Sequence, residues 1–347
     1  MKAAVLTDDK KIVAREVPVP VPGDDEVLIK VQWASICGTD IHIYLGEFKD
    51  RVTYPRILGH EFSGVVASAG KAVADLKEGD RVVVDPIIWC SRCPACLNGQ
   101  NNACSNLGLI GIETDGAFAE YAVADSSKVF KLPGSISTRD GSLAELYSLG
   151  VHSARKALIE PGDRVVVLGA GRLGLSVLEV IRQTAASWVC SVDILDYRLE
   201  IAGKMGADLT INNRRKDPVE EVLSLTGGLG VDRVIETVGA AVEIEGRELP
   251  VSQAVRMTRS GGRIVVMGLG PQFTPILWKE FVLKEIQLVG SRVTLGDFPR
   301  ALSMMSQCVF HPELLVTKEF DLEETPEAFH LLEEKPDSCL KVLIRIA

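Results

Sequence analysis

The sequence predicts an α/β protein with two domains, an antiparallel, barrel-like β domain and a doubly wound parallel sheet. Short β-type segments broken by glycine and proline fill the first 150 residues, as is typical of antiparallel sheets. From about residue 143 onward, apolar strands alternate with helices, which is typical of a parallel sheet covered on both faces. The length of 347 residues is enough for two hydrophobic cores.

The first domain is predicted to consist mainly of strands separated by turns. Residues 18–23 are rich in proline, and residues 78–80 carry a glycine. Proline fixes φ and glycine admits positive φ, so both segments are predicted to be turns or linkers. The predicted strands are residues 26–31, 64–69, 81–84 and 118–123.

The second domain is predicted to begin with a helix at 143–158, followed by the strand 164–168, a glycine turn and the helix 172–185. The strands are continuous apolar runs, as expected of strands buried on both faces. The alternation continues with strands at 188–193, 209–211, 233–237 and 263–267 and helices at 196–205, 219–226 and 250–258.

The C-terminal segment is expected to return to the first domain, because a barrel in one half of a chain often needs a closing strand from elsewhere. Its predicted elements are a helix at 297–306, a strand at 315–320, a helix at 324–332 and a strand at 341–346. The predicted domains are therefore residues 1–152 together with 293–347, and residues 153–292.

The charge balance excludes some classes of function. Forty-seven acidic side chains outnumber 38 basic ones, for a net charge of −9 and a pI near 5.3, whereas nucleic-acid binding depends mostly on Lys and Arg. The N-terminus is interrupted by charges too early for a signal peptide. The longest apolar runs of the whole chain are far shorter than the ~18 residues of a membrane span. We therefore expect a cytoplasmic protein that binds neither nucleic acid nor membrane.

The turn after the strand 164–168 has the G-x-G-x-x-G pattern of a dinucleotide site, with Gly169, Gly171 and Gly174 at the glycine positions. The first glycine permits the turn, the second lets the backbone approach a pyrophosphate, and the third lets the helix pack on the strand. Arg172 and Leu173 open the helix whose N-terminus would stabilise the phosphates. This context predicts a Rossmann domain.

Asp193 indicates which nicotinamide cofactor binds. It ends the next strand, nineteen residues past the last glycine, where a carboxylate accepts hydrogen bonds from the ribose hydroxyls of NAD and repels the 2′-phosphate of NADP. We therefore expect NAD. Arg198, five residues further on, is expected to reach the adenosine ribose, with a solvated helical arginine as its alternative. The alternative for the whole set is structural, with glycines that only form a turn and an aspartate that only caps a helix.

Four of the eight cysteines lie within fifteen positions: Cys90, Cys93, Cys96 and Cys104. In a reducing compartment such crowding indicates metal binding rather than disulfides, and four thiolates suit a closed, structural Zn²⁺ site. The spacing differs from that of a ferredoxin iron–sulfur run, and the charge balance disfavours a nucleic-acid-binding zinc ribbon. Unliganded core thiols are a further alternative for these four, and they are the expectation for three of the four remaining cysteines: Cys190, Cys308 and Cys339.

A second group of candidate metal ligands is dispersed in the sequence. It consists of Cys37, His60 and Glu61. Each has an ordinary structural explanation when taken alone: a small core side chain, a hydrogen-bonded histidine and a solvated acid at a strand end.

Taken together and in this order, the motifs resemble the zinc-dependent medium-chain dehydrogenase family, and within it the branch of polyol (sorbitol-type) and L-threonine dehydrogenases. The resemblance rests on the glycine turn, the four-cysteine loop and two further motifs, Cys37-Gly38-Thr39-Asp40-x-His42 and Gly59-His60-Glu61-Phe62-x-Gly64. It extends from about residue 2 to the C-terminus. It implies a GroES-like β-barrel catalytic domain beside the Rossmann domain.

The resemblance implies a catalytic zinc held by Cys37, His60 and Glu61, and therefore two Zn²⁺ per subunit. Three protein ligands leave a position where an alcohol oxygen can bind and lose its proton. Glu145 matches a further acid of the branch that ligates zinc directly or in exchange with Glu61. Leu146 stands where the family usually has proline.

Thr39 and His42 match the proton relay of the family. The hydroxyl proton would leave through Thr39 and the nicotinamide ribose to the imidazole of His42, a side chain suited to proton exchange with solvent. The alternative for Thr39 and Asp40 is a helix N-cap, and the sequence assigns no catalytic role to Asp40.

The implied function is NAD-dependent oxidation of a secondary hydroxyl on a small polar substrate, such as a polyol, sugar acid or cyclitol. L-threonine 3-dehydrogenase is an alternative, because residues 37–44 resemble that enzyme closely. A catalytically silent NAD-binding relative is an alternative of another class, although such a protein would tend to lose the open-site ligands first. The family also implies a homodimer or homotetramer that pairs through the last parallel strands, here residues 264–268 and 286–290.

One departure from the family is a longer spacing between Gly239 and Gly261, with extra residues near 242–248 that carry charges of both signs. In the family this loop lies near the nicotinamide. The extra residues therefore either shape cofactor closure or an intersubunit contact, or form a neutral surface loop.

Overall fold

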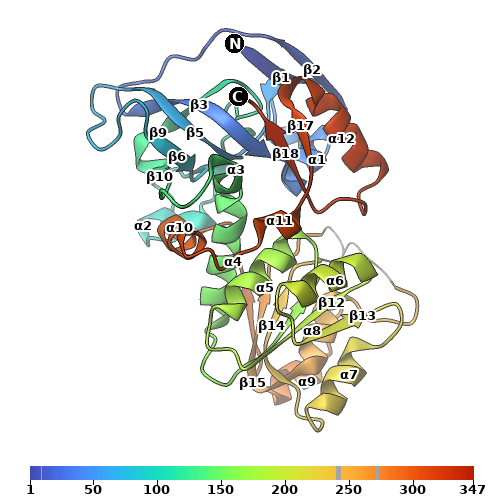
Figure 1. Ribbon diagram of the computed structural model, residues 1–347. Coiled ribbons are helices and arrows are strands. Elements are labelled where there is room, and N and C mark those ends of the chain that lie inside the picture. Colours follow the sequence, from blue (N-terminus) through green and yellow to red (C-terminus); the bar gives the residue numbers. More distant parts are fainter. Residues whose placement is uncertain (9, 240–243, 271–272) are drawn as a thin grey trace. The chain divides into compact units, whose positions relative to one another are not determined.

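A computed structural model describes residues 1–8, 10–239, 244–270 and 273–347, and the chain forms two compact units. Unit 1 consists of Met1–Leu146, Phe298–Cys308 and Pro312–Ala347, and unit 2 consists of Tyr147–Asp297 and Val309–His311. Figure 1 shows the N-terminal segment in blue and the C-terminal segment in red within the same unit. The functional division at residues 152/153 and 292/293 stays a prediction.

Unit 1 is built on a seven-stranded sheet in the order β10-β6-β5-β3-β18-β17, with β9 also paired to β3. Its pairs are antiparallel except β17 with β18. Because β18 pairs with β3, the C-terminal segment joins the first sheet as expected. The strands are β3 (Glu26–Ser35), β5 (Glu61–Ala69), β6 (Arg81–Val84), β9 (Tyr121–Asp125), β10 (Val129–Lys131), β17 (Val316–Asp321) and β18 (Lys341–Arg345).

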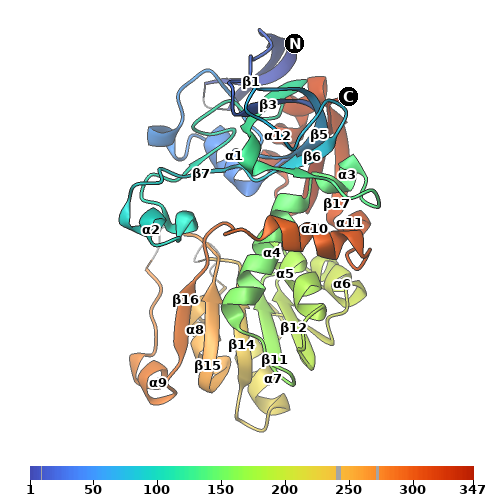
Figure 2. The same ribbon diagram turned by 90° about the vertical axis from the view of Figure 1, so that its left-hand side faces the viewer.

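Smaller elements complete unit 1. A three-stranded sheet has the order β2-β1-β4, and β7 pairs with β8. The strands are β1 (Lys2–Asp8), β2 (Lys11–Glu16), β4 (Arg56–Ile57), β7 (Ile87–Ile88) and β8 (Gly108–Leu109). The helices are α1 (Gly38–Tyr44), α2 (Pro94–Leu97), α3 (Thr138–Gly141), α10 (Phe298–Ser306), α11 (Pro312–Leu315) and α12 (Thr325–Glu334). Figure 2 shows α2 on a loop that projects from the strands of this unit.

Unit 2 contains a six-stranded, all-parallel sheet in the order β13-β12-β11-β14-β15-β16. The chain order reverses at β11, which is the topological switch point where ligands bind in such sheets. The strands are β11 (Arg164–Leu168), β12 (Trp188–Asp193), β13 (Leu209–Asn212), β14 (Val231–Glu236), β15 (Thr258–Val266) and β16 (Gln287–Gly290). The helices are α4 (Ala144–Ala157), which begins in unit 1, α5 (Arg172–Arg182), α6 (Asp196–Lys204), α7 (Pro218–Leu225), α8 (Pro250–Met257) and α9 (Trp278–Leu283).

The core of unit 2 is a continuous apolar layer across the sheet. Cys190, Val166, Val234 and Ile264 are neighbours in register on four adjacent strands, and each is completely buried. Helices α5 and α6 pack along β11–β13, and α8 packs along β14 and β15. Burial of each valine or isoleucine side chain in this layer contributes about 1.5–3 kcal/mol to the stability of the fold. No helix in the described ranges is long and apolar enough to cross a membrane.

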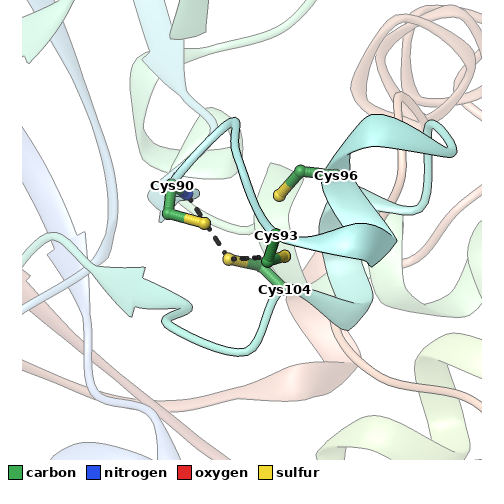
Figure 3. Close-up of side chains that lie close together, drawn as sticks. All are labelled: Cys90, Cys93, Cys96 and Cys104. Carbon is green, nitrogen blue, oxygen red and sulfur yellow. Dashed lines mark hydrogen bonds between the residues drawn. The ribbon is translucent and has the colours of Figure 1, made fainter.

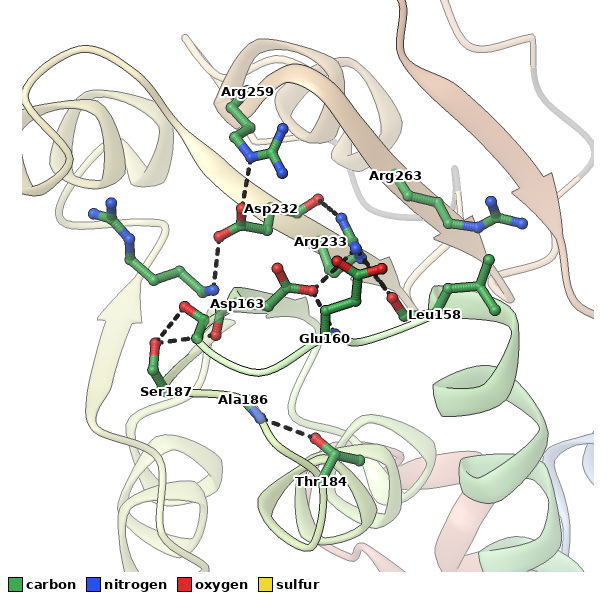
Figure 4. Close-up of polar contacts among 12 residues, drawn as sticks. Leu158, Glu160, Asp163, Thr184, Ala186, Ser187, Asp232, Arg233, Arg259 and Arg263 are labelled. Carbon is green, nitrogen blue, oxygen red and sulfur yellow. Dashed lines mark hydrogen bonds and ion pairs between the residues drawn. The ribbon is translucent and has the colours of Figure 1, made fainter.

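Two arginines at the amino-terminal end of the sheet contact the end of α4, and Figure 4 shows the contacts of the first, Arg233. Arg233 on β14 donates to the Leu158 carbonyl oxygen at 3.2 and 3.0 Å and pairs with Asp163 at 3.0 Å. Arg263 on β15 donates to the Lys156 carbonyl oxygen at 2.7 Å. Cations stabilise the carbonyl end of a helix, so these contacts stabilise the end of α4 that lies in unit 2.

The extra residues near 242–248 are described only in part, because Val242 and Glu243 lie outside the described residues. Within the described part, Arg247 donates from Nε to the Asn213 carbonyl oxygen at 3.1 Å, and Glu248 pairs with Arg256 at 3.5 Å. This part of the stretch is therefore attached to unit 2.

Candidate metal centres and dinucleotide site

Unit 1 brings Cys37, His60 and Glu61 together. Antiparallel pairing of Ser35 with Glu61 sets the end of β3 beside the start of β5. Cys37, two residues after β3, therefore lies near Glu61, the first residue of β5, and near His60, which precedes it. The three ligand atoms lie within 4.8 Å of one another, and His60 and Glu61 are buried. A thiol, an imidazole and a carboxylate at this spacing fit Zn²⁺ with one position left open.

Asp40, to which the sequence assigns no role, contacts two of these ligands. It is completely buried, and its Oδ2 accepts a hydrogen bond from Cys37 N at 2.8 Å. Its Oδ1 accepts from Gly59 N at 3.3 Å and lies 3.4 Å from His60 Nδ1. A carboxylate beside the second nitrogen of a metal-binding histidine orients the ring.

The charges around His60 fit a metal ion. Burial lowers the pKa of His60, but the Asp40 carboxylate and then Cys37 outweigh burial and raise the pKa well above the usual value. A bound dication would replace the proton that these negative groups attract. The N-cap of α1 is Cys37, and Asp40 at the third helical position accepts the Cys37 N–H in a capping box. The N-cap position expected at Thr39 or Asp40 was therefore wrong, but a capping role is confirmed for Asp40.

Glu61 pairs with a buried cation, Lys341, that the sequence interpretation missed. Lys341 on β18 is completely buried, pairs through Nζ with Glu61 Oε2, and donates to the Ile36 carbonyl oxygen at 3.2 Å. The Ser35 hydroxyl also donates to Glu61 Oε2. A lysine within the apolar strand at the C-terminus was the available signal, because a buried charge requires a partner.

Glu145 lies in the first turn of α4, is buried, and falls outside the 4.8 Å group of three ligands. Burial, followed by the nearby Glu61 carboxylate, raises the pKa of Glu145 to about 8. A cation in the site would oppose this shift. Ligation of zinc by Glu145 in exchange with Glu61 stays a prediction.

The two predicted relay residues lie on α1. Thr39 Oγ1 is 3.9 Å from the Cys37 sulfur, and His42 follows one turn later, on the same side of the helix. The His42 side chain is 53% exposed, and its Nδ1 is hydrogen-bonded to Glu47 Oε2 at 2.9 Å. The pair therefore extends from a candidate ligand to the solvent. Glu47 was missed because no motif includes it.

The four clustered cysteines converge in the loop around α2 (Figure 3). Their sulfurs lie within 4.8 Å of one another. Backbone N–H groups of Cys96 and Ser105 lower the pKa of Cys93 to about 6, whereas burial, with the neighbouring thiols, raises the pKa of Cys96 to about 12. Four thiols this close form a complete ligand set for tetrahedral Zn²⁺, which would deprotonate them on binding.

The three other cysteines differ in their surroundings. Cys190 and Cys339 are buried, as expected of core thiols, and burial raises the pKa of Cys190. Cys308 is exposed, so the core expectation was wrong for it. It lies just beyond the end of α10 with a φ of +55°, in a turn rather than within a packed element.

The glycine turn of unit 2 has the close backbone approaches of a dinucleotide site. Gly169 has a φ of +98°, and a Cβ there would lie 2.6 Å from Thr237 Oγ1. A Cβ on Gly174 would lie 1.9 Å from the Gly169 carbonyl oxygen. Gly171 is the N-cap of α5, and Arg172 and Leu173 form its first turn. A glycine N-cap leaves the helix N–H groups to a phosphate.

Asp193 at the end of β12 is joined to this turn. Its Oδ2 accepts from Ala170 N at 2.7 Å, and its Oδ1 accepts from Ile194 N at 2.7 Å and Leu195 N at 3.0 Å. Asp193 therefore joins the glycine turn to the loop after β12, but it does not cap α6 (Asp196–Lys204), whose N-cap is Leu195. Arg198 Nη1 lies 3.9 Å from Asp193 Oδ2, with the side chain only 17% exposed, so Arg198 is not simply solvated. Their roles in cofactor binding stay predictions.

Two known families match the chain. The family described as "Alcohol dehydrogenase GroES-like domain" matches residues 23–134, and the family described as "Zinc-binding dehydrogenase" matches residues 173–307. Sorbitol dehydrogenase of Bacillus subtilis (strain 168) is 34% identical over 350 residues, which cover 99% of this chain and 97% of that protein. L-threonine 3-dehydrogenase of Bacillus velezensis is 32% identical over 350 residues, with coverages of 99% and 98%.

Solved structures agree over the whole chain. An alcohol dehydrogenase of Escherichia coli CFT073 complexed with NADH has a TM-score of 0.90 at 31% identity, covering 99% of both chains. A zinc-binding dehydrogenase of Sinorhizobium meliloti 1021 bound to NADP has a TM-score of 0.91 at 31% identity, covering 99% of this chain and 98% of that one.

The matched families and the fold define an oxidoreductase that uses zinc and a nicotinamide dinucleotide. The chain belongs to the zinc-type alcohol dehydrogenase family, in the medium-chain class. The expected combination of a GroES-like domain and a Rossmann domain is thereby confirmed.

Proposed function

We propose that this enzyme oxidises a secondary hydroxyl of a small polar substrate, a polyol, sugar acid or cyclitol, to the ketone with NAD as the acceptor. The observation that carries the proposal is the group formed by Cys37, His60 and Glu61, three donors whose atoms lie within 4.8 Å. Such a set leaves a coordination position for the substrate oxygen. Similarity to a sorbitol dehydrogenase supports a polyol-type substrate.

The proposed zinc content is two ions per subunit. Cys37, His60 and Glu61, with Glu145 in exchange, would hold the catalytic ion. The other set would hold the structural ion: Cys90, Cys93, Cys96 and Cys104. When bound, catalytic zinc lowers the pKa of the substrate hydroxyl, and NAD accepts the hydride. Residues 1–152 with 293–347 are proposed as the catalytic domain and residues 153–292 as the NAD-binding domain.

The protein's own groups move the proton and orient the ligands. The Thr39 hydroxyl, which lies 3.9 Å from the Cys37 sulfur, would pass the substrate proton through the nicotinamide ribose to His42. His42 releases it to solvent, because its ring is half exposed and its Nδ1 is engaged by Glu47. Asp40 keeps the His60 ring in place.

NAD is proposed rather than NADP because of Asp193. Its carboxylate lies at the carboxyl end of β12, beside the glycine turn, with Oδ2 bonded to Ala170 N at 2.7 Å. A negative charge there disfavours a 2′-phosphate. Arg198 is proposed to reach the adenosine ribose. The relatives of known structure carry either cofactor, so the choice depends on this carboxylate.

A homo-oligomer is proposed, formed with a second copy through the edge of the unit 2 sheet. Strand β16 is the last in the sheet order, and Leu288 on it is 39% exposed. Trp278 and Leu283 on the preceding helix are 66% and 72% exposed. An open edge with exposed apolar side chains favours pairing with an identical edge.

L-threonine 3-dehydrogenase is the second candidate, favoured by residues 37–44 and by similarity to the Bacillus velezensis enzyme. One screen separates the two. Formation of NADH or NADPH is measured with zinc-loaded enzyme on polyols, sugar acids, cyclitols and L-threonine. We expect the highest kcat/KM with NAD and a polyol-class substrate. Preference for L-threonine would replace the first proposal by the second, and no turnover with any substrate would favour a catalytically silent protein.

A further inference from the structure

Glu236 is a completely buried carboxylate at the carboxyl end of β14. Its Oε1 accepts hydrogen bonds from Val238 N at 2.6 Å and Gly239 N at 2.7 Å. Its main-chain oxygen accepts from Met267 N, just beyond β15, at 2.8 Å. A single residue therefore holds the turn after β14 and also the chain that leaves β15.

The two segments joined by Glu236 touch backbone to backbone. A Cβ on Gly268 would lie 1.9 Å from Gly239 N and 2.7 Å from Glu236 Oε2. A Cβ on Gly239, whose φ is +76°, would lie 2.3 Å from the Leu269 carbonyl oxygen. We call this contact the Glu236 clamp: Glu236 with residues 237–239 and 267–269.

The clamp is energetically expensive. Glu236 Oε2 has no hydrogen-bond partner within the described residues. Burial raises the pKa of Glu236, although the backbone N–H groups of Gly239, Val238 and Gly268 lower it in part. The ladder between β14 and β15 pairs the strands without this side chain. A buried, half-satisfied carboxyl at a strand end is therefore not required to hold the sheet together, and it points to a role in shaping the turn.

The order of the strands places the clamp relative to the dinucleotide. The glycine turn after β11 suits the pyrophosphate, and Asp193 on β12 suits the adenosine ribose, so the nicotinamide half extends to the opposite side of β11, over β14 and β15. The clamp closes the carboxyl ends of those two strands. Thr237 Oγ1 also donates to the Leu168 carbonyl oxygen at 2.8 Å, which joins the clamp to the glycine turn.

We propose that Glu236 is a positioning residue for the nicotinamide half of NAD, acting by fixing the backbone of residues 237–239 against residues 267–269. The inference rests on the proposed placement of the dinucleotide. It predicts that loss of the carboxylate weakens binding of the nicotinamide half and leaves binding of the adenosine and pyrophosphate groups unchanged.

The test compares two ligands on zinc-loaded enzyme by calorimetric titration: NADH, and ADP-ribose, which lacks the nicotinamide. In Glu236→Met, the NADH affinity is expected to fall at least tenfold, with the ADP-ribose affinity within twofold of native. Glu236→Gln keeps an acceptor for Val238 N and Gly239 N and is expected to restore the NADH affinity to within threefold. If Glu236→Met does not fold, Glu236→Asp, whose shorter chain cannot reach both N–H groups, is expected to show the same split.

Glu179→Met is the matched control. Glu179 is another buried carboxylate of unit 2, which accepts from Tyr147 Oη at 3.0 Å and from His311 N at 2.6 Å. Its loss is expected to lower the melting temperature without separating the two ligands. Equal weakening of both ligands in the Glu236 variants, no weakening, or the same split in Glu179→Met would overturn the inference. Failure of the native enzyme to bind either ligand would instead contradict the proposed dinucleotide site.

Discussion

At the scale of single residues, the candidate catalytic set is surrounded by charges that hold each ligand in one position. Asp40 accepts the Cys37 N–H and faces His60, and Lys341 on β18, two strands away from β5 in the same sheet, pairs with Glu61. Removing one member of such a buried network leaves an unpaired charge, which costs about 3–5 kcal/mol. The geometry of the site therefore depends on residues that bind no metal.

The cofactor preference belongs to the residue scale. Replacing Asp193 by serine removes the charge that opposes a 2′-phosphate but keeps a short polar side chain near Ala170 N. We expect the ratio of kcat/KM for NAD to that for NADP to fall at least about tenfold, equivalent to about 1.4 kcal/mol. Steady-state rates with both cofactors measure the ratio. A ratio equal to that of the native enzyme would remove Asp193 from the selection.

At the scale of elements, the loop around α2 depends on its four thiolates. In Cys96→Ser, we expect loss of one zinc ion and a lower melting temperature, because the loop has only the short helix α2 and the Asn101–Ala103 turn of its own. For a chain of 347 residues, a loss of about 2 kcal/mol corresponds to roughly 3 °C. Metal analysis and calorimetry measure both. Two zinc ions and an unchanged melting temperature in this variant would contradict the structural site.

The strands of unit 2 could be predicted closely because each is a continuous apolar run: the predicted strands 164–168 and 188–193 are those observed. The strands β1 and β2 were not predicted. β2 buries one side chain in six, so its sequence has no alternation to detect. β15 begins at Thr258, where the sequence predicted the end of a helix, and it runs irregularly through Gly261 and Gly262 into the predicted strand 263–267.

The candidate site could be predicted only where motifs exist. Cys37, His60 and Glu61 stand in recognisable patterns, and Asp40 lies within one of them. The pairing of Asp40 with His60 and that of Lys341 with Glu61, however, depend on partners brought near by folding. Glu47 lies near His42 in sequence but outside every motif. Lys341 illustrates this, since its partner lies on β5 at the other end of the chain. Sequence spacing alone contains no information about such pairs.

At the scale of the whole molecule, stability in acid depends on Asp297, at the end of unit 2. Burial opposes ionisation, but hydrogen bonds from His152 at 2.8 Å and from Arg155 lower the pKa of Asp297 to about 2. The shift from 3.8 corresponds to about 2 kcal/mol, at about 1.4 kcal/mol per pKa unit. A carboxylate with a lowered pKa contributes stability above its unfolded pKa, near 4, and loses it as the pH falls towards 2.

At pH 7, Asp297→Asn is therefore expected to unfold at a lower denaturant concentration than native, because its free energy of unfolding is lower by about 2 kcal/mol. The difference in free energy is expected to shrink below pH 4. Urea unfolding of the two proteins from pH 7 to pH 2 measures the difference. Asp75→Asn, at an exposed position, is the control and is expected to match native throughout. A difference between Asp297→Asn and native that stays constant across this range would contradict the ion-pair account.

The most direct test of the central claim is the rate of NADH formation by Cys37→Ser, measured on the best substrate together with the zinc content. The account predicts two zinc ions in the native chain and one in the variant, with turnover at least about a thousandfold lower, equivalent to about 4 kcal/mol. Turnover at the native rate in a variant that holds a single zinc ion would contradict the assignment of Cys37, His60 and Glu61 as the catalytic metal site.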